Sequence, residues 1–312
     1  MPFAEQSWAS FVALLNHRAR EQPMQRALGF LADCDTGVAW GTFRQLDDRA
    51  RGIAARLQAS DCPGQTALLL YEPGPEFVAA FLGCLYAGVI AVPACLPRPR
   101  RPLTRLAGIA ADAGVKLALT TGELLPNLSL QFRGDRVLDA VPRLATDTVD
   151  PACAGQWQPP PLTPRSVACL QYTSGSTANP KGVVLTHGNL LSNSRRIYDA
   201  FQHGPDSMGV IWLPPYHDMG LIGGILQPLY GGFPTVLMSP ARVVQQPLRW
   251  LEAISSFRAT TSGGPNFIYE ACVDRLRVED CHALDLSSWR VAFNGAEPIR
   301  AETLDRFAEK FA

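Results

Sequence analysis

Short apolar runs alternate with longer amphipathic segments along this chain of 312 residues. Helical spacing of the apolar positions predicts helices at Phe11–Gln22, Phe43–Ala59, Leu103–Ala113, Asn189–Phe201, Leu221–Leu229, Pro247–Phe257 and Ala301–Phe311. Compact apolar runs predict strands at Ala67–Leu70, Leu117–Thr120, Val167–Leu170, Val210–Leu213, Pro234–Met238 and Ser288–Phe293, and one that begins at Ala259–Thr261. Such alternation of helices and strands is typical of α/β proteins with parallel sheets.

One uncharged segment, Phe77–Leu96, has the length of a membrane-spanning helix. Gly88 and Pro93 divide this segment, and Pro75 stands where a helix would begin. A helix from Pro75 to Gly88 followed by a buried strand at Val89–Val92 explains the glycine and the prolines, whereas a membrane span does not. We therefore expect a helix–glycine–strand unit, and we do not expect an integral membrane protein.

The composition favours a globular protein and argues against several classes of binding site. Hydrophobic residues make up 47% of the chain, which is enough for a sizeable core, and the formal net charge is zero. A neutral chain lacks the basic surface that non-specific nucleic-acid binding needs, so we expect no nucleic-acid partner. The 8 cysteines are scattered and form no Cys-x-x-Cys pair, which argues against a zinc site and a disulfide framework. The N-terminus does not resemble a signal peptide, so we expect reduced thiols and a cytoplasmic protein.

The segment from Tyr172 to His187 is the strongest candidate for chemistry. It follows the apolar run at Val167–Leu170 and combines hydroxyl side chains, glycines and Lys181 in one short loop. Backbone N–H groups, hydroxyls and an ammonium group in such a loop can converge on one anion, as in a polyphosphate cradle. The loop differs from the Walker pattern because Gly182, and not Ser or Thr, follows the lysine. For His187 we favour a role in capping or packing the helix that follows.

Three further clusters rich in glycine or proline follow predicted strands. In Trp212–Leu226, His217 and Asp218 precede an apolar segment, which suits a ligand with a polar head and an apolar tail; a histidine satisfied within its own loop is the alternative. The paired glycines of Thr261–Phe267 favour close approach of a ligand, a tight turn, or both. Phe293–Arg300 follows a strand at the carboxyl edge, where α/β sheets bind ligands.

Residues 172–187 resemble the phosphate-binding motif of the adenylate-forming superfamily, which includes acyl-CoA synthetases, nonribosomal adenylation domains and luciferases. The chain is most similar to the fatty acyl-AMP ligases at Leu68–Tyr71, Phe81–Pro93, Trp212–Leu226, Ser262–Phe267 and Asn294–Arg300. The resemblance covers essentially the whole chain and implies an α/β fold with a layered αβαβα core and two stacked lobes. We expect residues 61–200 to form the first lobe and residues 201–312 the second, with residues 1–60 packed on the second lobe.

The resemblance also implies roles for individual residues. The β- and γ-phosphates of ATP would be held by Thr173, Ser174, Gly175, Ser176, Thr177 and Lys181. His217 would lie beside the acyl carboxylate and the α-phosphate. Adenine and ribose would lie, largely against backbone, along Asn294, Gly295, Ala296, Glu297 and Pro298. The acyl tail would follow Met219, Gly220, Ile222, Gly263 and Gly264. Many members of the superfamily have glycine where Ala178 stands, although fatty acyl-AMP ligases often do not.

The implied reaction is the ATP-dependent activation of a fatty acid to an acyl-adenylate with release of pyrophosphate. Mg²⁺ would bridge the phosphates, and the thiol of an acyl carrier protein would then take the acyl group. The resemblance places the metal-binding carboxylate, the ribose-binding aspartate and a small C-terminal domain beyond Ala312, and the last predicted helix ends without a stop signal. We therefore expect a truncated N-terminal adenylation domain that alone is a weak catalyst or inactive.

Two alternatives stay open at this point. The first is an acyl-CoA synthetase-type ligase that uses CoA as the acceptor. The second is a non-catalytic remnant that binds an acyl group or a nucleotide. The apolar residues of the implied tunnel favour a medium or long acyl tail.

Overall fold

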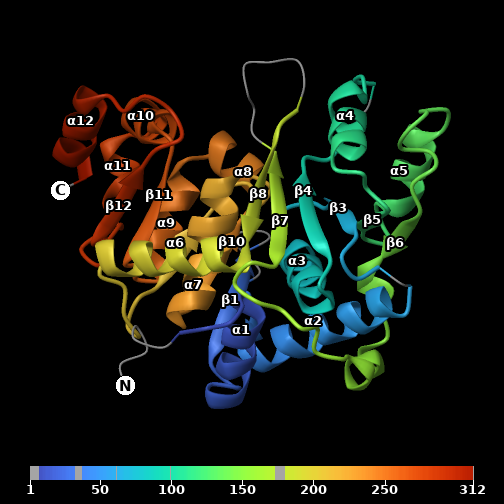
Figure 1. Cartoon of the computed structure of the whole chain (residues 1–312). Helices are drawn as coiled ribbons and strands as arrows, with labels where there is room; N and C mark the ends of the chain where they lie inside the picture. Colours follow the sequence, from blue (N-terminus) through green and yellow to red (C-terminus); the bar gives the residue numbers. More distant parts are fainter. Residues whose placement is uncertain (1–6, 32–36, 61, 99, 173–179, 312) are drawn as a thin grey trace. The chain divides into compact units, whose positions relative to one another are not determined.

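The computed structural model describes residues 7–31, 37–60, 62–98, 100–172 and 180–311 (Figure 1). The chain divides into two compact units. Unit 1 holds the described residues of Met1–Met24, Thr42–Arg195 and Tyr216–Asp218. Unit 2 holds those of Gln25–Gly41, Arg196–Pro215 and Met219–Ala312. Each unit contains one six-stranded sheet and its own helices, which confirms the predicted α/β class.

The sheet of unit 1 has the strand order β6-β5-β3-β4-β7-β8. Its strands are β3 (Thr66–Leu70), β4 (Ile90–Ala94), β5 (Leu117–Thr120), β6 (Arg143–Ala145), β7 (Val167–Tyr172) and β8 (Gly182–Thr186). All neighbouring pairs are parallel except β7 and β8, which are antiparallel. The carboxyl ends of β3, β4, β5, β6 and β7 therefore meet at one edge, and β7 leads into the candidate phosphate loop there.

The helices of unit 1 lie before, between and after its strands in the sequence. They are α1 (Phe11–Glu21), α2 (Phe43–Gln58), α3 (Pro75–Ala87), α4 (Thr104–Asp112), α5 (Leu125–Phe132) and α6 (His187–Ala200), with the short 3₁₀ helices η2 (Thr146–Thr148) and η3 (Pro151–Gln156). The boundary between the units falls within α6. One hydrophobic cluster joins β3, β4 and β5 to α4 and α5, and its two aromatic side chains are Phe132 and Tyr172.

Helix α3 explains the apolar segment that has the length of a membrane span. Pro75 opens the helix, and Gly88 ends it with a φ of 70°, a backbone conformation that side chains disfavour. Strand β4 begins two residues later, as the sequence predicts. Every residue from Phe77 to Ala87 is buried, so apolar character all round the helix reflects a position inside the unit. Within the part of the chain that the structure describes, no helix has the length and apolar character to cross a bilayer.

The sheet of unit 2 has the order β12-β11-β9-β10-β1-β2. Its strands are β1 (Arg26–Leu31), β2 (Ala39–Thr42), β9 (Gly209–Ile211), β10 (Thr235–Met238), β11 (Thr261–Gly264) and β12 (Val291–Asn294). Strands β12, β11, β9 and β10 are parallel, so the segments that follow β9, β11 and β12 leave the same edge. Three of the four predicted clusters thus begin at one edge of unit 2, although Tyr216–Asp218 within Trp212–Leu226 belong to unit 1.

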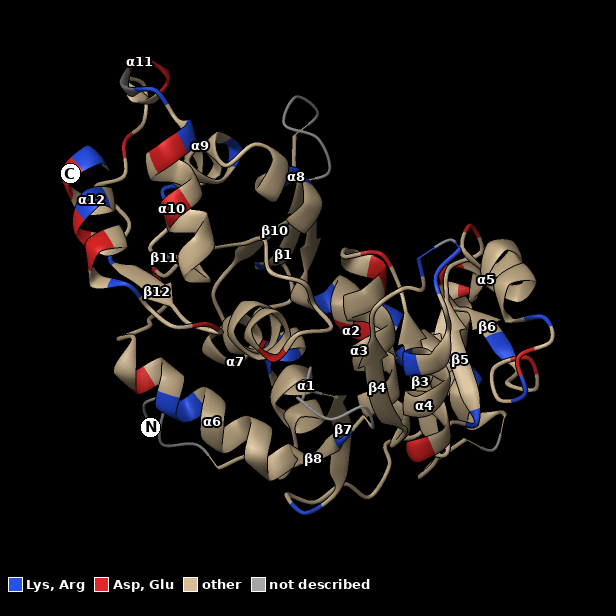
Figure 2. Ribbon diagram, turned by 90° about the horizontal axis from the view of Figure 1, so that it is seen from above, with Lys and Arg blue, Asp and Glu red and all other residues tan. Residues whose placement is uncertain are grey.

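Unit 2 also holds a π-helix and several short helices. They are η4 (Met219–Leu226), α7 (Gln227–Gly231), α8 (Pro240–Gln245), α9 (Leu248–Ser256), α10 (Asn266–Arg275), α11 (Val278–Cys281) and α12 (Ala301–Phe311). Figure 2 shows the charged residues of this unit gathered on α9, α10 and α12, while β10 and β11 carry none. The sequence predicts one helix at Leu221–Leu229, and the structure replaces it with η4 followed by α7.

The sequence predicts that residues 1–60 pack on the second lobe, but the structure divides them between the two units. The described residues up to Met24, and those from Thr42 onward, belong to unit 1; only Gln25–Gly41 belong to unit 2. The reason is the packing of α2 on α3. A Cβ on Gly83 would lie 2.5 Å from Cγ2 of Ile53, so the two helices approach through that glycine. The apolar face of α2 is therefore buried within unit 1.

Candidate functional site

The candidate phosphate loop belongs to the β7–β8 hairpin of unit 1. Thr173, Ser174, Gly175, Ser176 and Thr177 lie outside the described residues, so the structure describes only the two ends of the loop. Tyr172 pairs with Gly182 as the last pair of the antiparallel ladder before the loop. Lys181, directly before this pair, is exposed. The geometry therefore presents the lysine at the carboxyl end of β7.

The end of the same hairpin confirms the structural role predicted for His187. Thr186 and Asn189 cap α6 reciprocally: the Asn189 N–H donates to Oγ1 of Thr186 (3.1 Å), and the Thr186 N–H donates to Oδ1 of Asn189 (3.0 Å). The imidazole of His187 is fully buried, and its Nδ1 accepts a hydrogen bond from the Phe11 N–H (3.2 Å). Burial lowers the pKa of His187 to about 4, so this side chain is neutral near pH 7.

His217 lies on a segment that strand β7 holds in place. Gln171, the residue before Tyr172, donates from Nε2 to the carbonyl oxygen of Tyr216 (2.7 Å). Nδ1 of His217 lies 2.7 Å from Oδ1 of Asp218, and both side chains are about half exposed. This contact turns the imidazole ring toward the carboxylate of Asp218. Strand β7 thus connects the loop and the His217 segment, which are separate clusters in the sequence.

The residues predicted to bind the acyl tail begin on η4. Met219 and Ile222 are half-buried, and Gly220 is buried. A Cβ on Gly220 would overlap the backbone of Pro214, so glycine is required there by the chain's own packing. At Gly223, in contrast, a Cβ would meet nothing within 4 Å. Extended π-helical geometry is rare and frequently marks functional sites, which makes η4 notable within this unit.

Gly263 and Gly264 differ from the expectation that they follow a strand, because they are the last two residues of β11 itself. A Cβ on Gly263 would overlap the carbonyl oxygen and ring of Phe293 on the neighbouring strand. A Cβ on Gly264 would lie 2.5 Å from Cζ2 of Trp212. Close approach is therefore the reason for both glycines, and the approaching groups belong to this chain. Their role in acyl binding stays a prediction.

The predicted nucleotide-binding residues follow β12. Ala296 has a φ of 68°, which is uncommon for a residue with a side chain, and Gly295 precedes it. The carboxylate of Glu297 accepts a hydrogen bond from the N–H of Phe267 in the first turn of α10 (2.7 Å). Pro298 follows and is exposed. The side chain of Glu297 therefore supports the loop, which leaves the backbone as the surface that can meet a ligand.

Asn294, at the end of β12, carries a polar atom that the described residues do not satisfy. Its Nδ2 donates to Oδ1 of Asn266 (3.4 Å), while its Oδ1 is buried and has no hydrogen-bond partner among the described residues. A buried acceptor without a partner is costly unless a ligand or water supplies a donor. Nearby, Cε of Met219 would lie 3.3 Å from a Cβ on Gly295. Unit 2 thus brings together two residue sets that the sequence assigns to the acyl tail and to the nucleotide.

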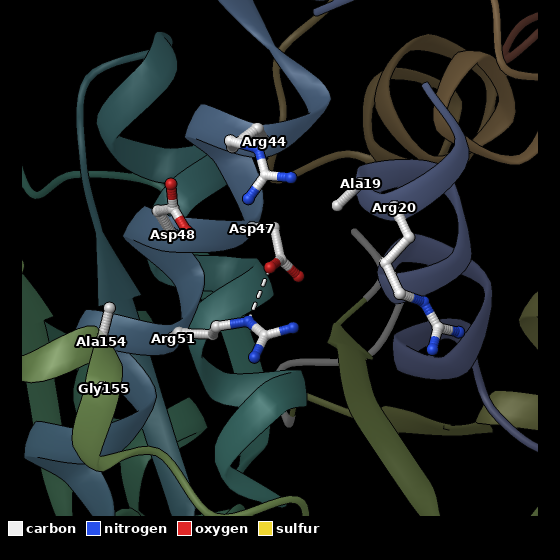
Figure 3. Close-up of a pocket in the computed structure, with 8 residues that line it drawn as sticks. All are labelled: Ala19, Arg20, Arg44, Asp47, Asp48, Arg51, Ala154 and Gly155. Atoms are coloured by element: carbon white, nitrogen blue, oxygen red, sulfur yellow. Dashed lines mark hydrogen bonds and ion pairs between the residues drawn. The ribbon is translucent and has the colours of Figure 1, made fainter. Parts of the chain in front are cut away.

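Unit 1 also contains a pocket that no sequence motif predicts (Figure 3). It measures about 300 Å³ and is lined by Ala19, Arg20, Arg44, Asp47, Asp48, Arg51, Ala154 and Gly155. Its floor is an ion pair in which Nε of Arg51 lies 2.6 Å from Oδ2 of the buried Asp47. The hydroxyl of Tyr86 donates to the other oxygen of Asp47 (2.7 Å). This network supports the packing of α2 on α3 and lies among residues outside the predicted site.

Metal-binding geometry is absent from the part of the chain that the structure describes. No group of three or more His, Cys, Asp or Glu side chains there is placed to hold a metal ion. The seven described cysteines are free thiols, at positions 62, 84, 95, 153, 169, 272 and 281.

Comparisons with known proteins agree with the family resemblance that the sequence motifs indicate. The family model described as AMP-binding enzyme matches residues 15–312. The chain is 41% identical over 97% of its length to the medium-chain-fatty-acid–[acyl-carrier-protein] ligase JamA of Moorena producens. It is 35% identical over 94% of its length to the corresponding ligase TtuA of Teredinibacter turnerae. In both cases the match covers 52% of the relative, so the chain spans about half the length of the curated relatives it matches.

A solved structure is similar over the whole chain. It is the fatty acyl-adenylate ligase from L. pneumophila, in complex with acyl adenylate and pyrophosphate. The TM-score is 0.93 at 40% sequence identity, and the match covers 100% of this chain and 54% of that one. The resemblance drawn from the sequence motifs is thereby confirmed at the level of the family and of the fold.

Proposed function

Because the chain belongs to the AMP-binding enzyme family, we propose that it takes part in activating a fatty acid as its acyl-adenylate. A carboxylate oxygen of the fatty acid attacks the α-phosphorus of ATP, the bond from that phosphorus to the bridging oxygen breaks, and pyrophosphate leaves with the electron pair. The observation that carries this proposal is the similarity over the full chain to a ligase solved with acyl adenylate and pyrophosphate.

Unit 1 supplies the groups for the charged part of the reaction. Both reactants are anions, so cationic and N–H donors must offset their repulsion. Lys181, exposed at the end of the β7–β8 hairpin, would contact the phosphates together with Thr173–Thr177. His217, oriented by Asp218, would lie at the junction of carboxylate and α-phosphate. Mg²⁺ bound to ATP would offset part of the phosphate charge.

Unit 2 supplies the surface for adenine and the acyl tail. The unsatisfied Oδ1 of Asn294 is an acceptor that suits the exocyclic amine of adenine. Gly295, Ala296, Glu297 and Pro298 would offer backbone, and Met219, Gly220 and Ile222 would meet the apolar tail. Gly263 and Gly264 would contribute only backbone, because their Cα positions are closely packed.

The acceptor of the acyl group is the second part of the proposal. We propose the phosphopantetheine thiol of an acyl carrier protein, because the relatives JamA and TtuA are named as ligases of that acceptor. Free thiols at the seven described cysteines fit a reducing compartment such as the cytoplasm. A CoA ligase is the alternative. Transfer from preformed acyl-adenylate to CoA in preference to holo-carrier protein, in a protein that contains this chain, would favour the alternative.

Binding measurements test the nucleotide and acyl sites. Calorimetry of the wild-type chain with ATP, and with a stable acyl-sulfamoyl analogue of the adenylate, should give saturable binding. Lys181→Ala should weaken ATP about tenfold through loss of a charge-assisted hydrogen bond. Lys116→Ala is the matched control, because Lys116 precedes β5 at the opposite edge of the same sheet. Failure of the wild type to bind both compounds would refute the proposal.

The acyl site needs a variant that does not disturb packing. Gly263→Trp is unsuitable because any side chain there overlaps Phe293. Ile222→Trp, on the half-buried face of η4, should instead shorten the acyl tail that the analogue can carry without loss of affinity. The same tail-length dependence in the variant and the wild type would count against Ile222 as part of the acyl surface. A non-catalytic remnant would be favoured if the gene had no open frame continuing past Ala312.

A further inference from the structure

Helix α4 contacts both ends of the candidate phosphate loop. We propose that Tyr172 and Asp112 are positioning residues that hold Lys181 for phosphate binding. The effect on phosphate binding rests on the proposed function, whereas the positioning of Lys181 rests on contacts between described residues of unit 1.

The first contact lies at the start of the loop. The hydroxyl of Tyr172 donates a hydrogen bond to Oδ2 of Asp112, the last residue of α4, at 2.5 Å. A carboxylate acceptor makes this bond stronger than one between neutral groups. Burial, followed by the bond to Asp112, raises the pKa of Tyr172, so the hydroxyl keeps its proton and remains the donor at ordinary pH.

The ring of Tyr172 links this bond to the other end of the loop. A Cβ on Gly182 would lie 2.8 Å from Cζ of the Tyr172 ring, so the ring packs directly against the Gly182 backbone. The two residues are also paired in the ladder of β7 and β8. A side chain at position 182 would displace the ring and its hydroxyl together. The residue after Lys181 is therefore anchored to α4 through the tyrosine.

The second contact fixes the residue before Lys181. Cγ of Pro180 would lie 3.3 Å from a Cβ on Gly108, so the proline ring packs on α4 where that helix has no side chain. Gly108 and Asp112 are four positions apart and share one face of the helix. This face of α4 therefore holds the loop directly at Pro180 and, through the Tyr172 ring, at Gly182, while Lys181 itself stays exposed.

The contribution of the Tyr172–Asp112 hydrogen bond to ATP binding can be measured separately from its contribution to the stability of the fold. Asp112 is exposed, so it returns to water when the hydroxyl is removed, and little stability should be lost. Tyr86 and Asp47 form a comparable hydrogen bond in the same unit (2.7 Å), but that pair is buried and far from Lys181 in sequence. Tyr86→Phe is therefore a matched control: it should cost stability and leave ATP affinity unchanged.

The experiment measures the ATP dissociation constant and the unfolding midpoint in parallel. Tyr172→Phe and Asp112→Ala should each weaken ATP about tenfold with little change in the midpoint. Asp112→Asn keeps an acceptor oxygen and should retain most of the affinity. The double variant should be no weaker than either single variant, because both remove the same bond. Wild-type affinity in both Tyr172→Phe and Asp112→Ala would overturn the proposal.

A second measurement does not depend on nucleotide. Trypsin cleaves after Lys181 only when this backbone can enter the protease, so loss of the anchor should speed cleavage several-fold in Tyr172→Phe but not in Tyr86→Phe. If the wild type bound no ATP, the proposed function would fail, and this cleavage rate would still decide the geometric claim. Equal cleavage rates at Lys181 in the wild type and Tyr172→Phe would refute it.

Discussion

The edges of the two units that carry the candidate ligand-binding residues are held in place by different means. In unit 1, polar bonds fix the edge: Tyr172 donates to Asp112, and Gln171 donates to the backbone of Tyr216. In unit 2, close packing fixes it: Gly264 of β11 lies against Trp212, and Trp212 meets the ring of Trp250 edge to face. The side chains proposed for the charged phosphates belong to unit 1. Most of those proposed for the apolar tail belong to unit 2.

This difference affects how mutations should be interpreted. The Tyr172–Asp112 bond has an exposed acceptor and can be removed at low cost to stability, so function at this edge of unit 1 can be probed separately. A substitution in a packed strand changes the fold before it changes any ligand contact. Loss of binding in unit 2 variants is therefore informative only when stability is measured beside it.

The largest expected effect is the removal of the aromatic centre of unit 2. Trp250 is fully buried, packs edge to face on Tyr269 and Trp289, and donates from Nε1 to Oγ of Ser262 on β11 (2.8 Å). Trp250→Ala should lower the free energy of unfolding by about 4 kcal/mol. Chemical denaturation followed by circular dichroism measures this change. A loss below about 1 kcal/mol would mean that packing at this edge is less important than we argue.

A smaller effect is expected where β11 meets Trp212. Gly264→Val would place a branched side chain against that indole, and we expect a loss of about 3 kcal/mol in unfolding free energy. Gly223→Ala is the control in the same unit, since a Cβ there meets nothing within 4 Å. It should change stability by no more than about 1 kcal/mol. Equal losses in the two variants would show that close approach does not explain the glycines of β11.

The loss of folding stability at acid pH should depend on one buried histidine in each unit, His187 and His203. Burial lowers the pKa of His187 from 6.5 to about 4, and burial together with Arg290 lowers the pKa of His203 in the same way. The unfolded chain therefore binds protons first as pH falls below about 6.5, so stability is present above that pH and is lost toward pH 4. Each histidine should cost about 2 kcal/mol at about pH 5.

Single substitutions separate the two histidines. His187→Gln and His203→Gln should each flatten part of the pH dependence of unfolding, measured by denaturant titration between about pH 7.5 and about pH 5. We expect similar changes in both, because burial is the leading cause in each case. A pH dependence that stayed the same in both variants would contradict this assignment.

The sequence predicts much of the fold because the prolines and glycines that begin and end helices act locally. Pro75 and Gly88 delimit α3 within one or two residues, and the apolar runs of β3 and β5 are strands as expected. The missed elements are short or depend on distant partners. The segment 172–187 predicts a loop where the structure has strand β8, because Val183 and Val184 are exposed and only pairing with β7 makes them a strand.

The candidate site is predictable only in part for the same reason. Lys181 and His217 stand out because their motifs are continuous in sequence. Asp112 gives no local signal, because its bond to Tyr172 spans 60 positions. The glycine pair of β11 indicates close approach of some group, but the sequence does not show that Phe293 and Trp212 occupy the space beside it.

The smallest expected effect compares matched valines on the two sheets. Val236 on β10 is fully buried between parallel neighbours, whereas Val184 on the edge strand β8 is 56% exposed. Replacement by threonine keeps the shape and adds a hydroxyl. Val236→Thr should cost about 2 kcal/mol because the hydroxyl loses water, and Val184→Thr less than about 0.5 kcal/mol. Denaturant titration of both variants measures the difference. Strand β8 also carries Gly182, which lies beside the Tyr172 ring. If α4 positions Lys181, Val184→Thr should leave the ATP affinity unchanged. A weakened ATP affinity would mean that the hairpin itself, and not α4, positions Lys181.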